Sequence, residues 1–289
     1  MSQSAVDDLI QLLDIEPIEV NIFRGNSPKE DRQRVFGGQV AGQALVAAAR
    51  TVDDDDSRHV HSLHAYFLRP GDPSVPILYE VDRIRDGRSF TTRRVVAIQH
   101  GRAIFNMSAS FQVPEEGLEH CFPMPEAPDP ESLPTRRKRL EFLADKLGDL
   151  LDRPQAIDTR VEWSPTDRAE SLPPHQQVWL RADGKLPDDP LLHTIVLTYA
   201  SDMTLLDTAL LPHGGTWFNP TLFMASLDHA MWFHRPFRAD EWLLYSQDTP
   251  TATSGRGLAR GLVYTRGGEL VASVVQEGLI RVVREGGPQ

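Results

Sequence analysis

The spacing of apolar residues changes several times along the first half of the chain. A short amphipathic helix is expected from Ser4, and alternation over 18–23 indicates a strand. From Gly37 to about Thr51 nearly every residue is small or apolar, which predicts a helix that is buried on most sides. Alternating segments then predict antiparallel strands at about 59–68, 77–85, 90–98 and 103–112. This order is typical of an antiparallel sheet that curls around one long helix.

The second half of the chain shows the same order of elements. Strands are predicted near 157–163 and 178–182, followed by a helix from about Leu191 to Leu210. Further strands are predicted near 222–233, 242–251, 257–264 and 270–282. The protein is therefore expected to be an α+β fold made of two small units.

A sequence repeat supports this division. The segment Tyr66-Phe-Leu-Arg-Pro70 recurs as Trp232-Phe-His-Arg-Pro236, and Gly87-Arg88 recurs as Gly255-Arg256 at nearly the same offset. Two copies are too few for a solenoid, so a pair of units packed face to face is the expected arrangement. We place the first unit at 1–115 and the second at 156–289.

The segment 116–155 between the units is rich in proline, glutamate and basic residues, as in a connector. One amphipathic helix is expected inside it, with an apolar stripe formed by Leu140, Leu143, Leu147, Leu150 and Leu151. The basic run 136–139 at the start of this helix is expected to be a solvated face, and the alternative is a contact with ligand phosphates.

Composition and charge narrow the function classes. The 289 residues carry a formal net charge of -11, which argues against nucleic-acid binding because phosphate contacts need a basic surface. Cys121 is the single cysteine, so no intramolecular disulfide can form and a reducing compartment is the simpler setting. We find no signal peptide, no apolar run of bilayer length and no peroxisomal address, and therefore predict a cytoplasmic protein without membrane contacts. The acidic run 53–56 is expected to be a solvated turn.

Three familiar kinds of site do not fit the sequence. There is no Gly-x-Ser-x-Gly segment to hold a serine nucleophile. The glycine-rich segment 37–44 lacks the Lys-Ser/Thr ending of a phosphate loop. On a regular strand His59 and His61 share one face while His64 faces the other, and no carboxylate pattern completes a metal site. We therefore expect no metal and no cofactor.

Asp202 is the acidic residue that most needs an explanation. It lies in the predicted helix among apolar and small residues, where a carboxylate is destabilised unless hydrogen bonds compensate its lost hydration. Ser226, near the strand that follows, and Gln276, within the apolar last strand, are placed where they could converge with it. Taken singly, each of the three also fits an ordinary structural role.

Several long motifs resemble the acyl-CoA thioesterase II family. They are Val35-Phe-Gly-Gly-Gln-Val-Ala-Gly-Gln-Ala-Leu45, His61-Ser-Leu-His-Ala-Tyr-Phe-Leu-Arg-Pro-Gly71, Asp228-His-Ala-Met-Trp-Phe-His-Arg-Pro-Phe237 and Val275-Gln-Glu-Gly278. The resemblance covers nearly the whole chain and is weakest in the connector. It implies a double hotdog fold, in which two curved antiparallel sheets each wrap around a long helix. It also implies hydrolysis of acyl-CoA to free fatty acid and coenzyme A without a cofactor, and association into a homo-oligomer, either a dimer or a tetramer.

In that family an Asp, a Thr or Ser, and a Gln orient and activate a water against the thioester carbonyl. By motif, the resemblance assigns these roles to Asp202, Ser226 and Gln276. A thioester carbonyl is already electrophilic, so the reaction needs a held water, a general base and donors for the developing negative charge. A backbone N–H near a helix start is hypothesised to be such a donor, and the turn at Gly37 and Gly38 of the opposite unit is one candidate, which makes these glycines candidate substrate-binding residues.

The repeat predicts one catalytic set per chain. When the offset between the matched strand motifs is applied, Ser226 corresponds approximately to Val60 and Gln276 to Ala109. At the same offset, Asp202 falls near Phe36. The segment 35–49 contains no acidic residue. Only the second unit therefore supplies a base.

Two other functions are weighed against this one. Hotdog enoyl-CoA hydratases resemble the thioesterases in fold but use an Asp with a His five residues later, and that position here is Asp207. A non-catalytic acyl-CoA-binding protein would have no need of a buried base, although fold alone never proves activity. Release of free thiol, compared with hydration of crotonyl-CoA, separates these alternatives.

Overall fold

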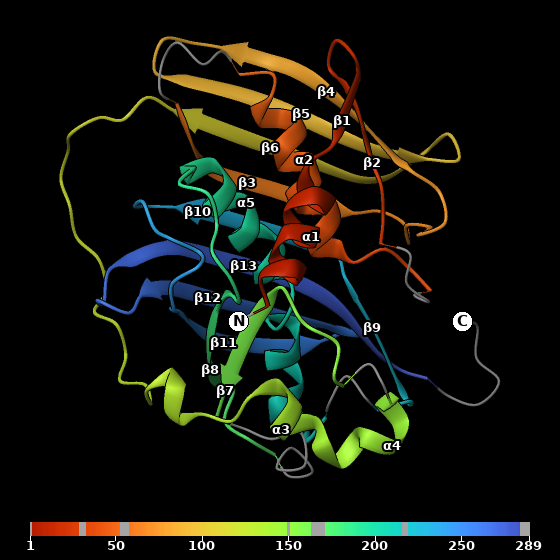
Figure 1. Ribbon diagram of the computed structural model, residues 1–289, viewed down its shortest axis with the longest axis vertical. Coiled ribbons are helices and arrows are strands. Elements are labelled where there is room, and N and C mark those ends of the chain that lie inside the picture. The colour runs from red at the N-terminus through yellow and green to blue at the C-terminus, as the bar shows by residue number, and fades with distance from the viewer. Residues whose placement is uncertain are drawn as a thin grey trace.

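The computed structural model describes residues 2–28, 33–52, 58–148, 151–162, 171–215 and 219–283 (Figure 1). The acidic run 53–56, Trp163 and Leu150, which the sequence predictions include, lie outside these residues. Within the described ranges, no helix is long and apolar enough to cross a membrane.

The strands of the described residues form one antiparallel sheet, which is 13-stranded. In the first half, neighbouring strands follow the order β1 (Glu16–Glu19), β2 (Ile22–Gly25), β4 (Ile77–Asp86), β5 (Phe90–Gln99), β6 (Arg102–Gln112) and β3 (His59–Phe67). The second half continues with β10 (Asp228–Phe233), β13 (Leu270–Val282), β12 (Arg256–Thr265), β11 (Leu243–Thr253), β8 (His175–Ala182) and β7 (Ile157–Val161). A further strand, β9 (Leu222–Ser226), pairs with the end of β13. The two predicted sheets are therefore halves of one sheet, joined where β3 pairs with β10.

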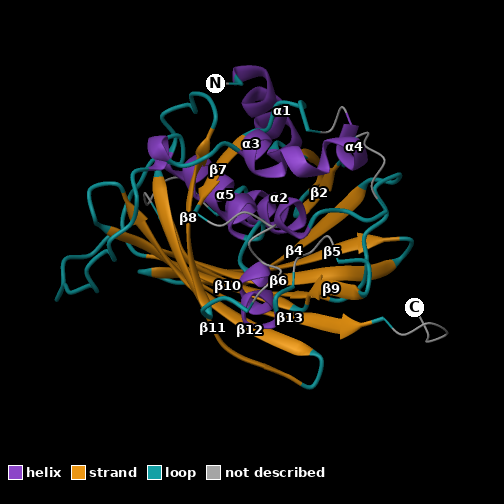
Figure 2. Ribbon diagram, turned by 90° about the horizontal axis from the view of Figure 1, so that it is seen from below, coloured by secondary structure: helices purple, strands orange, loops and turns teal. Residues whose placement is uncertain are grey.

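Two long helices, α2 (Gly37–Ala49) and α5 (Pro190–Ser201), lie on the concave face of this sheet (Figure 2). A Cβ atom added at Gly38 would lie 2.3 Å from the carbonyl oxygen of Tyr199, and one at Gly42 would lie 2.8 Å from Cδ2 of Leu13. The small residues predicted for this helix therefore let α2 pack closely against both α5 and α1 (Gln3–Leu13).

The pairing of β3 with β10 relates the two halves by a local two-fold axis. His64 pairs with Ala230. These two residues are separated by the same number of positions as Tyr66 and Trp232, the first residues of the repeated motif. Each half thus presents the same strand, in the same register, to the other half.

The predicted helix 191–210 is wrong in its second half. α5 ends at Ser201, and a 3-10 helix, η6 (Leu206–His213), follows after a turn. The sheet holds this turn, because Gln247 Nε2 donates to Thr204 Oγ1 at 2.7 Å and Gln176 Nε2 donates to the carbonyl oxygen of Thr204 at 3.4 Å. Side-chain bonds from distant strands replace helical backbone bonds here, and apolar spacing does not reveal them.

Two predicted strands are each divided in two. The segment 18–23 belongs to the hairpin of β1 and β2, with Asn21 at a φ of 62° in the turn. The segment 222–233 breaks at Leu227, whose N–H donates to the carbonyl oxygen of Glu277 at 2.9 Å and whose carbonyl oxygen accepts from the N–H of Phe67 at 2.9 Å. This break lets β9 pair with the end of β13 while β10 lies between β13 and β3.

The connector helix is also shorter than predicted. It consists of α3 (Arg136–Leu140), the 3-10 turn η3 (Glu141–Leu143) and α4 (Ala144–Leu147). The backbone leaves helical geometry at Leu140 and Leu143, with ψ angles of 5° and 10°, and both leucines then pack with Leu151 in a small separate core. Three leucines of the predicted stripe thus pack together where the helix is divided into pieces.

Upstream of these pieces the connector loops out from the end of β6 and then returns to the second half of the sheet (Figure 1). Trp179 Nε1 donates to the carbonyl oxygen of Pro128 at 2.8 Å. Trp242 Nε1 donates to Glu131 Oε1 at 2.9 Å, in the 3-10 turn η2 (Pro130–Ser132). Two tryptophans therefore anchor the connector to β8 and to the start of β11.

Candidate active site

Asp202 lies at the C-terminal end of α5, as its cap residue. Ser226 Oγ donates to Asp202 Oδ1 at 3.1 Å, and Gln276 Nε2 donates to the same oxygen at 2.5 Å. Gln276 Nε2 also donates to Ser226 Oγ at 2.9 Å. The structure thus brings together the three side chains that the sequence singled out, although Asp202 caps the helix instead of lying within it.

The register of the sheet places Ser226 and Gln276 beside each other. Ser226 is the last residue of β9 and pairs with Gly278 of β13. Gln276 and Gly278 are two residues apart on one strand, so both face the helices. A Cβ atom at Gly278 would lie 2.3 Å from Cδ1 of Leu206, which shows how closely the segment after Asp202 packs on this strand.

The N-terminus of α2 reaches the same place from the first half. The backbone N–H of Gly38 donates to the Asp202 carboxylate. A Cβ atom at Gly37 would lie 2.6 Å from Asp202 Oδ2 and 2.9 Å from Cε1 of Phe67, so this position has no room for a side chain. The partial positive charge at the start of a helix also favours a carboxylate here. Both predicted glycines therefore contact or adjoin the carboxylate of the second half.

The pKa of Asp202 is raised to about 6, because its carboxylate is densely surrounded by protein. The hydrogen bonds from Gln276, Ser226 and Gly38 act in the opposite direction and favour the charged form. The residue nevertheless keeps part of its surface accessible to solvent. Asp202 is thus ionised at neutral pH and able to accept a proton close to that range.

Gln276 offers one further polar atom to this site. Its side chain is fully buried, and its Oε1 accepts no hydrogen bond from the described residues. A buried carbonyl oxygen without a donor is unfavourable unless a ligand or water supplies the hydrogen. The arrangement therefore places a carboxylate that can accept a proton, a hydroxyl and a free acceptor within a few ångströms of each other.

Comparisons with known proteins agree with this geometry. The family model described as acyl-CoA thioesterase matches residues 151–279, and that of the acyl-CoA thioesterase N-terminal domain matches 27–112. The chain is 43% identical over 286 residues to acyl-coenzyme A thioesterase 8 of Homo sapiens, with 94% of this chain and 88% of the relative covered. It is 40% identical over 282 residues to acyl-CoA thioesterase 2 of Haemophilus influenzae, with 96% and 98% covered.

A solved structure leads to the same family. The crystal structure of an acyl-CoA thioesterase II from Mycobacterium marinum matches with a TM-score of 0.79 and 49% identity, covering 95% of this chain and 98% of that one. The chain belongs to the acyl-CoA thioesterase II family. It is a thioester hydrolase that acts on fatty acyl-CoA. A hot dog fold protein from Alicyclobacillus acidocaldarius, 19% identical with a TM-score of 0.76, shares the fold.

Behind Asp202, the thioesterase has a buried histidine that the sequence predictions missed. His229 Nε2 lies 2.8 Å from Ser201 Oγ, and Ser201 Oγ donates to the carbonyl oxygen of Thr198 at 2.9 Å. Because the serine hydrogen is used in that bond, the histidine donates and is the Nε2-protonated neutral form. Burial lowers the pKa of His229 to about 4, which agrees with a neutral ring. His229 thereby holds Ser201, the residue that precedes Asp202. The sequence signal for this role was a histidine at an inward-facing position of an apolar strand.

A buried amide pair supports the other side of Asp202. Gln176 Nε2 donates to Gln247 Oε1 at 2.8 Å, and Thr208 Oγ1 donates to the same oxygen at 2.9 Å. Together with the bond from Gln247 to Thr204, these contacts join β8 and β11 to the chain that follows Asp202. Sequence alone did not pair these residues, since they are far apart along the chain.

The three histidines of β3 lie differently from the prediction. Val60 and Leu63 are both buried, because the register shifts between Val60 and Ser62. This bulge turns His61 and His64 to the same outer face, where His61 Nε2 lies 2.8 Å from Ser110 Oγ. No group of three metal-binding side chains occurs within the part of the chain that the structure describes.

Proposed function

We propose that this thioesterase hydrolyses its substrate by direct attack of a water that Asp202 activates. The water oxygen adds to the thioester carbonyl carbon while the Asp202 carboxylate takes one water proton. The resulting tetrahedral intermediate then expels the coenzyme A thiolate, which receives the proton from Asp202. Free fatty acid and coenzyme A leave, and Asp202 is again ionised.

The observation that carries this proposal is the hydrogen-bonded triangle of Asp202, Ser226 and Gln276. Its carboxylate is buried enough to have a raised pKa and is still partly accessible to solvent. In the proposed complex, Ser226 and the free Oε1 of Gln276 accept or donate bonds to the water and hold it beside the base. A purely structural carboxylate would have no use for an unfilled acceptor at this point.

For the negatively charged oxygen of the intermediate, the proposed donors are backbone N–H groups at the start of α2. The helix dipole is positive there, and a short approach is possible because Gly37 and Gly38 have no side chains. Gly38 donates to Asp202 in this structure. The N–H of Gly37 is therefore the first candidate for the substrate oxygen, and the site needs both halves of the chain.

We also propose that each half is a hotdog unit, at 1–115 and 156–289, with 116–155 as the connector. The separate matches at 27–112 and 151–279 and the local two-fold axis support this division. α1 belongs to the first unit but contacts the second, because Gln3 Nε2 donates to the carbonyl oxygen of Lys185 at 3.1 Å. A dimeric or tetrameric assembly and a cytoplasmic location stay predictions.

Single-turnover hydrolysis in water enriched in oxygen-18, with enzyme in excess over octanoyl-CoA, tests direct attack. We expect one heavy oxygen in the octanoate and no acyl group on the protein in quenched samples. Octanoate without the label, or stoichiometric acyl-protein during the first turnover, would refute direct attack and point to Asp202 as a nucleophile. A parallel assay with crotonyl-CoA should give thiol release without hydration.

A further inference from the structure

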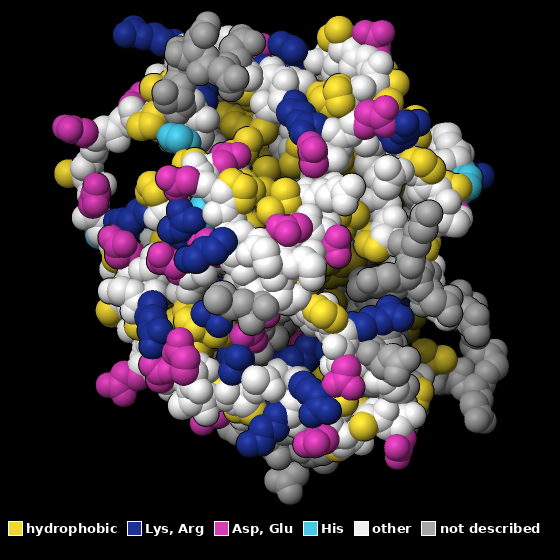
Figure 3. Space-filling view, in the orientation of Figure 1, with side chains coloured by type: hydrophobic (Ala, Val, Ile, Leu, Met, Phe, Trp, Pro, Cys, Tyr) yellow, Lys and Arg dark blue, Asp and Glu magenta, His cyan; other side chains and the backbone are white. Residues whose placement is uncertain are grey.

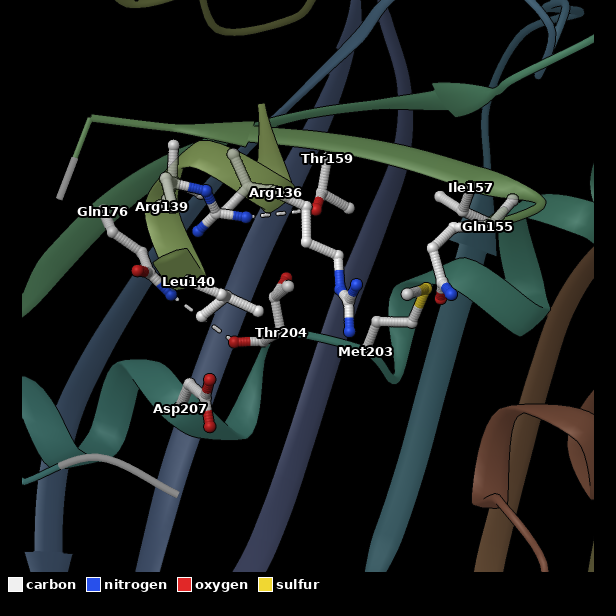
Figure 4. Close-up of a pocket in the computed structure, with 12 residues that line it drawn as sticks. Arg136, Arg139, Leu140, Gln155, Ile157, Thr159, Gln176, Met203, Thr204 and Asp207 are labelled. Atoms are coloured by element: carbon white, nitrogen blue, oxygen red, sulfur yellow. Dashed lines mark hydrogen bonds between the residues drawn. The ribbon is translucent and has the colours of Figure 1, made fainter. Parts of the chain in front are cut away.

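A cavity of about 160 Å³ lies beside the turn that follows Asp202 (Figure 4). Met203 and Thr204, the two residues after Asp202, form part of its wall, and strands β7 and β8 form another part. α3 of the connector lies over it and contributes Arg136 and Arg139. The cavity therefore adjoins the catalytic residue along the chain but is closed by a segment outside both halves of the repeat.

Arg136 is the unusual residue of this cavity. Its side chain is half-buried and extends into the cavity toward Met203 (Figure 4). Among the described residues, its guanidinium has no hydrogen bond and no ion pair, and burial lowers its pKa. A partly desolvated cation without an acidic partner is unfavourable unless an anion joins it.

Two neighbouring basic residues, Arg137 and Arg139, have side-chain partners within the protein, which sets Arg136 apart. Arg137 Nε lies 2.7 Å from Asp152 Oδ1. Arg139 Nη2 donates to Thr159 Oγ1 at 3.4 Å, on the wall of the cavity. On this face of the molecule, Lys and Arg side chains near α3 alternate with acidic ones (Figure 3).

The rest of the cavity wall is mixed in character. Gln155 and Thr159 supply polar groups near Arg136, and Asp207 lies on the other side of the cavity (Figure 4). A pocket for a plain alkyl chain is expected to be lined mostly by apolar side chains. A second hollow of about 340 Å³ shares Arg136 and Thr159 with this cavity. Arg136 thus lies where two hollows adjoin.

We propose that this cavity binds an anionic oxygen group of the acyl-CoA substrate, with Arg136 as the principal contact. The planar guanidinium presents paired donors that suit both carboxylate and phosphate oxygens. Two parts of a substrate carry such oxygens: the phosphates of coenzyme A, and a carboxylate at the far end of a dicarboxylic acyl chain. This inference rests on the acyl-CoA thioesterase activity and concerns substrate affinity, not the chemical step.

The test compares wild-type enzyme with Arg136→Gln on three thioesters of equal chain length. These are octanoyl-CoA, octanoyl-pantetheine, which lacks the nucleotide and its phosphates, and the coenzyme A monothioester of octanedioic acid. Lys138→Gln is the matched control, because it removes the same charge from an exposed position of the same short helix. Arg136→Lys keeps the charge and removes the paired geometry.

If Arg136 holds a phosphate, Arg136→Gln raises KM about tenfold or more for both coenzyme A esters and leaves octanoyl-pantetheine unchanged. If it holds a distal carboxylate, KM rises only for the octanedioic ester. In either case the KM of Arg136→Lys for the affected thioesters should lie between the KM of the wild type and that of Arg136→Gln.

The proposal is overturned if the KM of Arg136→Gln stays within about twofold of the KM of Lys138→Gln for all three thioesters. It is equally overturned if kcat falls alike for all three while KM is unchanged, since that pattern indicates a structural role. Failure of the water-attack mechanism would appear instead in the oxygen-18 measurement on the wild-type enzyme, so the two outcomes are distinguishable.

Discussion

The C-terminal cap residue of α5 in the second half is Asp202, and that of its counterpart α2 in the first half is Arg50. Asp202 turns toward β9 and β13 and accepts hydrogen bonds from both. Arg50 donates to the carbonyl oxygen of Ile15 and forms an ion pair with Asp14. The same place in the architecture therefore carries a carboxylate in one half and a guanidinium in the other.

The strands beside these two helix ends also differ, because the second half has polar residues where the first half has apolar ones. Ser226 pairs with Gly278 as Val60 pairs with Phe111 in the first half. Val60 and Phe111 are both buried, and so is Ala109, which the repeat matches to Gln276. Apolar side chains thus occupy the strand positions that correspond to Ser226 and Gln276, and the buried Arg93, which pairs with Ala109, donates to Thr51 Oγ1 at 2.8 Å beside them.

The two helices are offset along the chain by a different number of residues than the matched strands. The offset measured on the strands put the counterpart of Asp202 near Phe36, at the wrong end of α2. Loops of different length precede the strands in the two halves, so an offset measured on strands does not hold for the helices. The expectation of one catalytic set per chain stays a prediction, now supported by Arg50 in place of an acid.

The largest effect is expected from Asp202→Asn. Loss of the base should lower kcat for octanoyl-CoA by about a thousandfold, measured as release of free thiol. Asp145→Asn, an exposed carboxylate of α4, should leave kcat unchanged. Retention of more than about a tenth of the activity would show that the first half, or another base, supports turnover.

Gly37→Ala should lower kcat by roughly ten- to a hundredfold, because its Cβ atom would displace Asp202 Oδ2 or the ring of Phe67. Gly117→Ala is the matched control, since an added Cβ atom there meets nothing within 4 Å. Equal activity of the two variants would mean that the first half does not position the base.

Gln276→Ala should lower kcat about tenfold or more and also move the pH profile. In the wild type, activity should fall as pH decreases through about 6, because Asp202 takes up a proton. The bond from Gln276 lowers the pKa of Asp202, so its loss should shift this limb to higher pH. A limb that stays in place, or moves to lower pH, would contradict the assignment of the profile to Asp202.

The smallest effects are expected at Ser226. Ser226→Ala should lower kcat by up to about tenfold, since Gln276 and Gly38 still bond to Asp202. Ser226→Thr keeps the hydroxyl and adds a methyl that restricts its rotamer, so its kcat should equal or exceed that of the wild type. A Thr variant no better than the Ala variant would show that the hydroxyl is not what matters at this position.

Much of this architecture follows from local patterns. The bounds of the small-residue helix α2 and of strands β3 to β6 were predicted within a residue or two. Each of these segments has a clear pattern of apolar residues and a clear end in the sequence. The family motifs also indicated Asp202, Ser226 and Gln276, and the structure brings their side chains into contact.

The parts that local patterns missed depend on contacts between distant residues. The early end of α5 depends on Gln176 and Gln247, and the bulge in β3 reversed the expected direction of His64. The bond from Gly38 to Asp202 joins residues of different halves. No periodicity in the sequence encodes such pairings.

The ladder between β3 and β10 has one more consequence. The connector exposes Leu118 and Phe122, with relative exposures of 105% and 73%, and is therefore an evident place for a protease to cut. The backbone hydrogen bonds from Asp228 to Trp232 with Ser62 to Tyr66 do not depend on that peptide link. The two halves of a chain cleaved in the connector are expected to remain associated, because the backbone hydrogen bonds between β3 and β10 hold them together without the peptide connection.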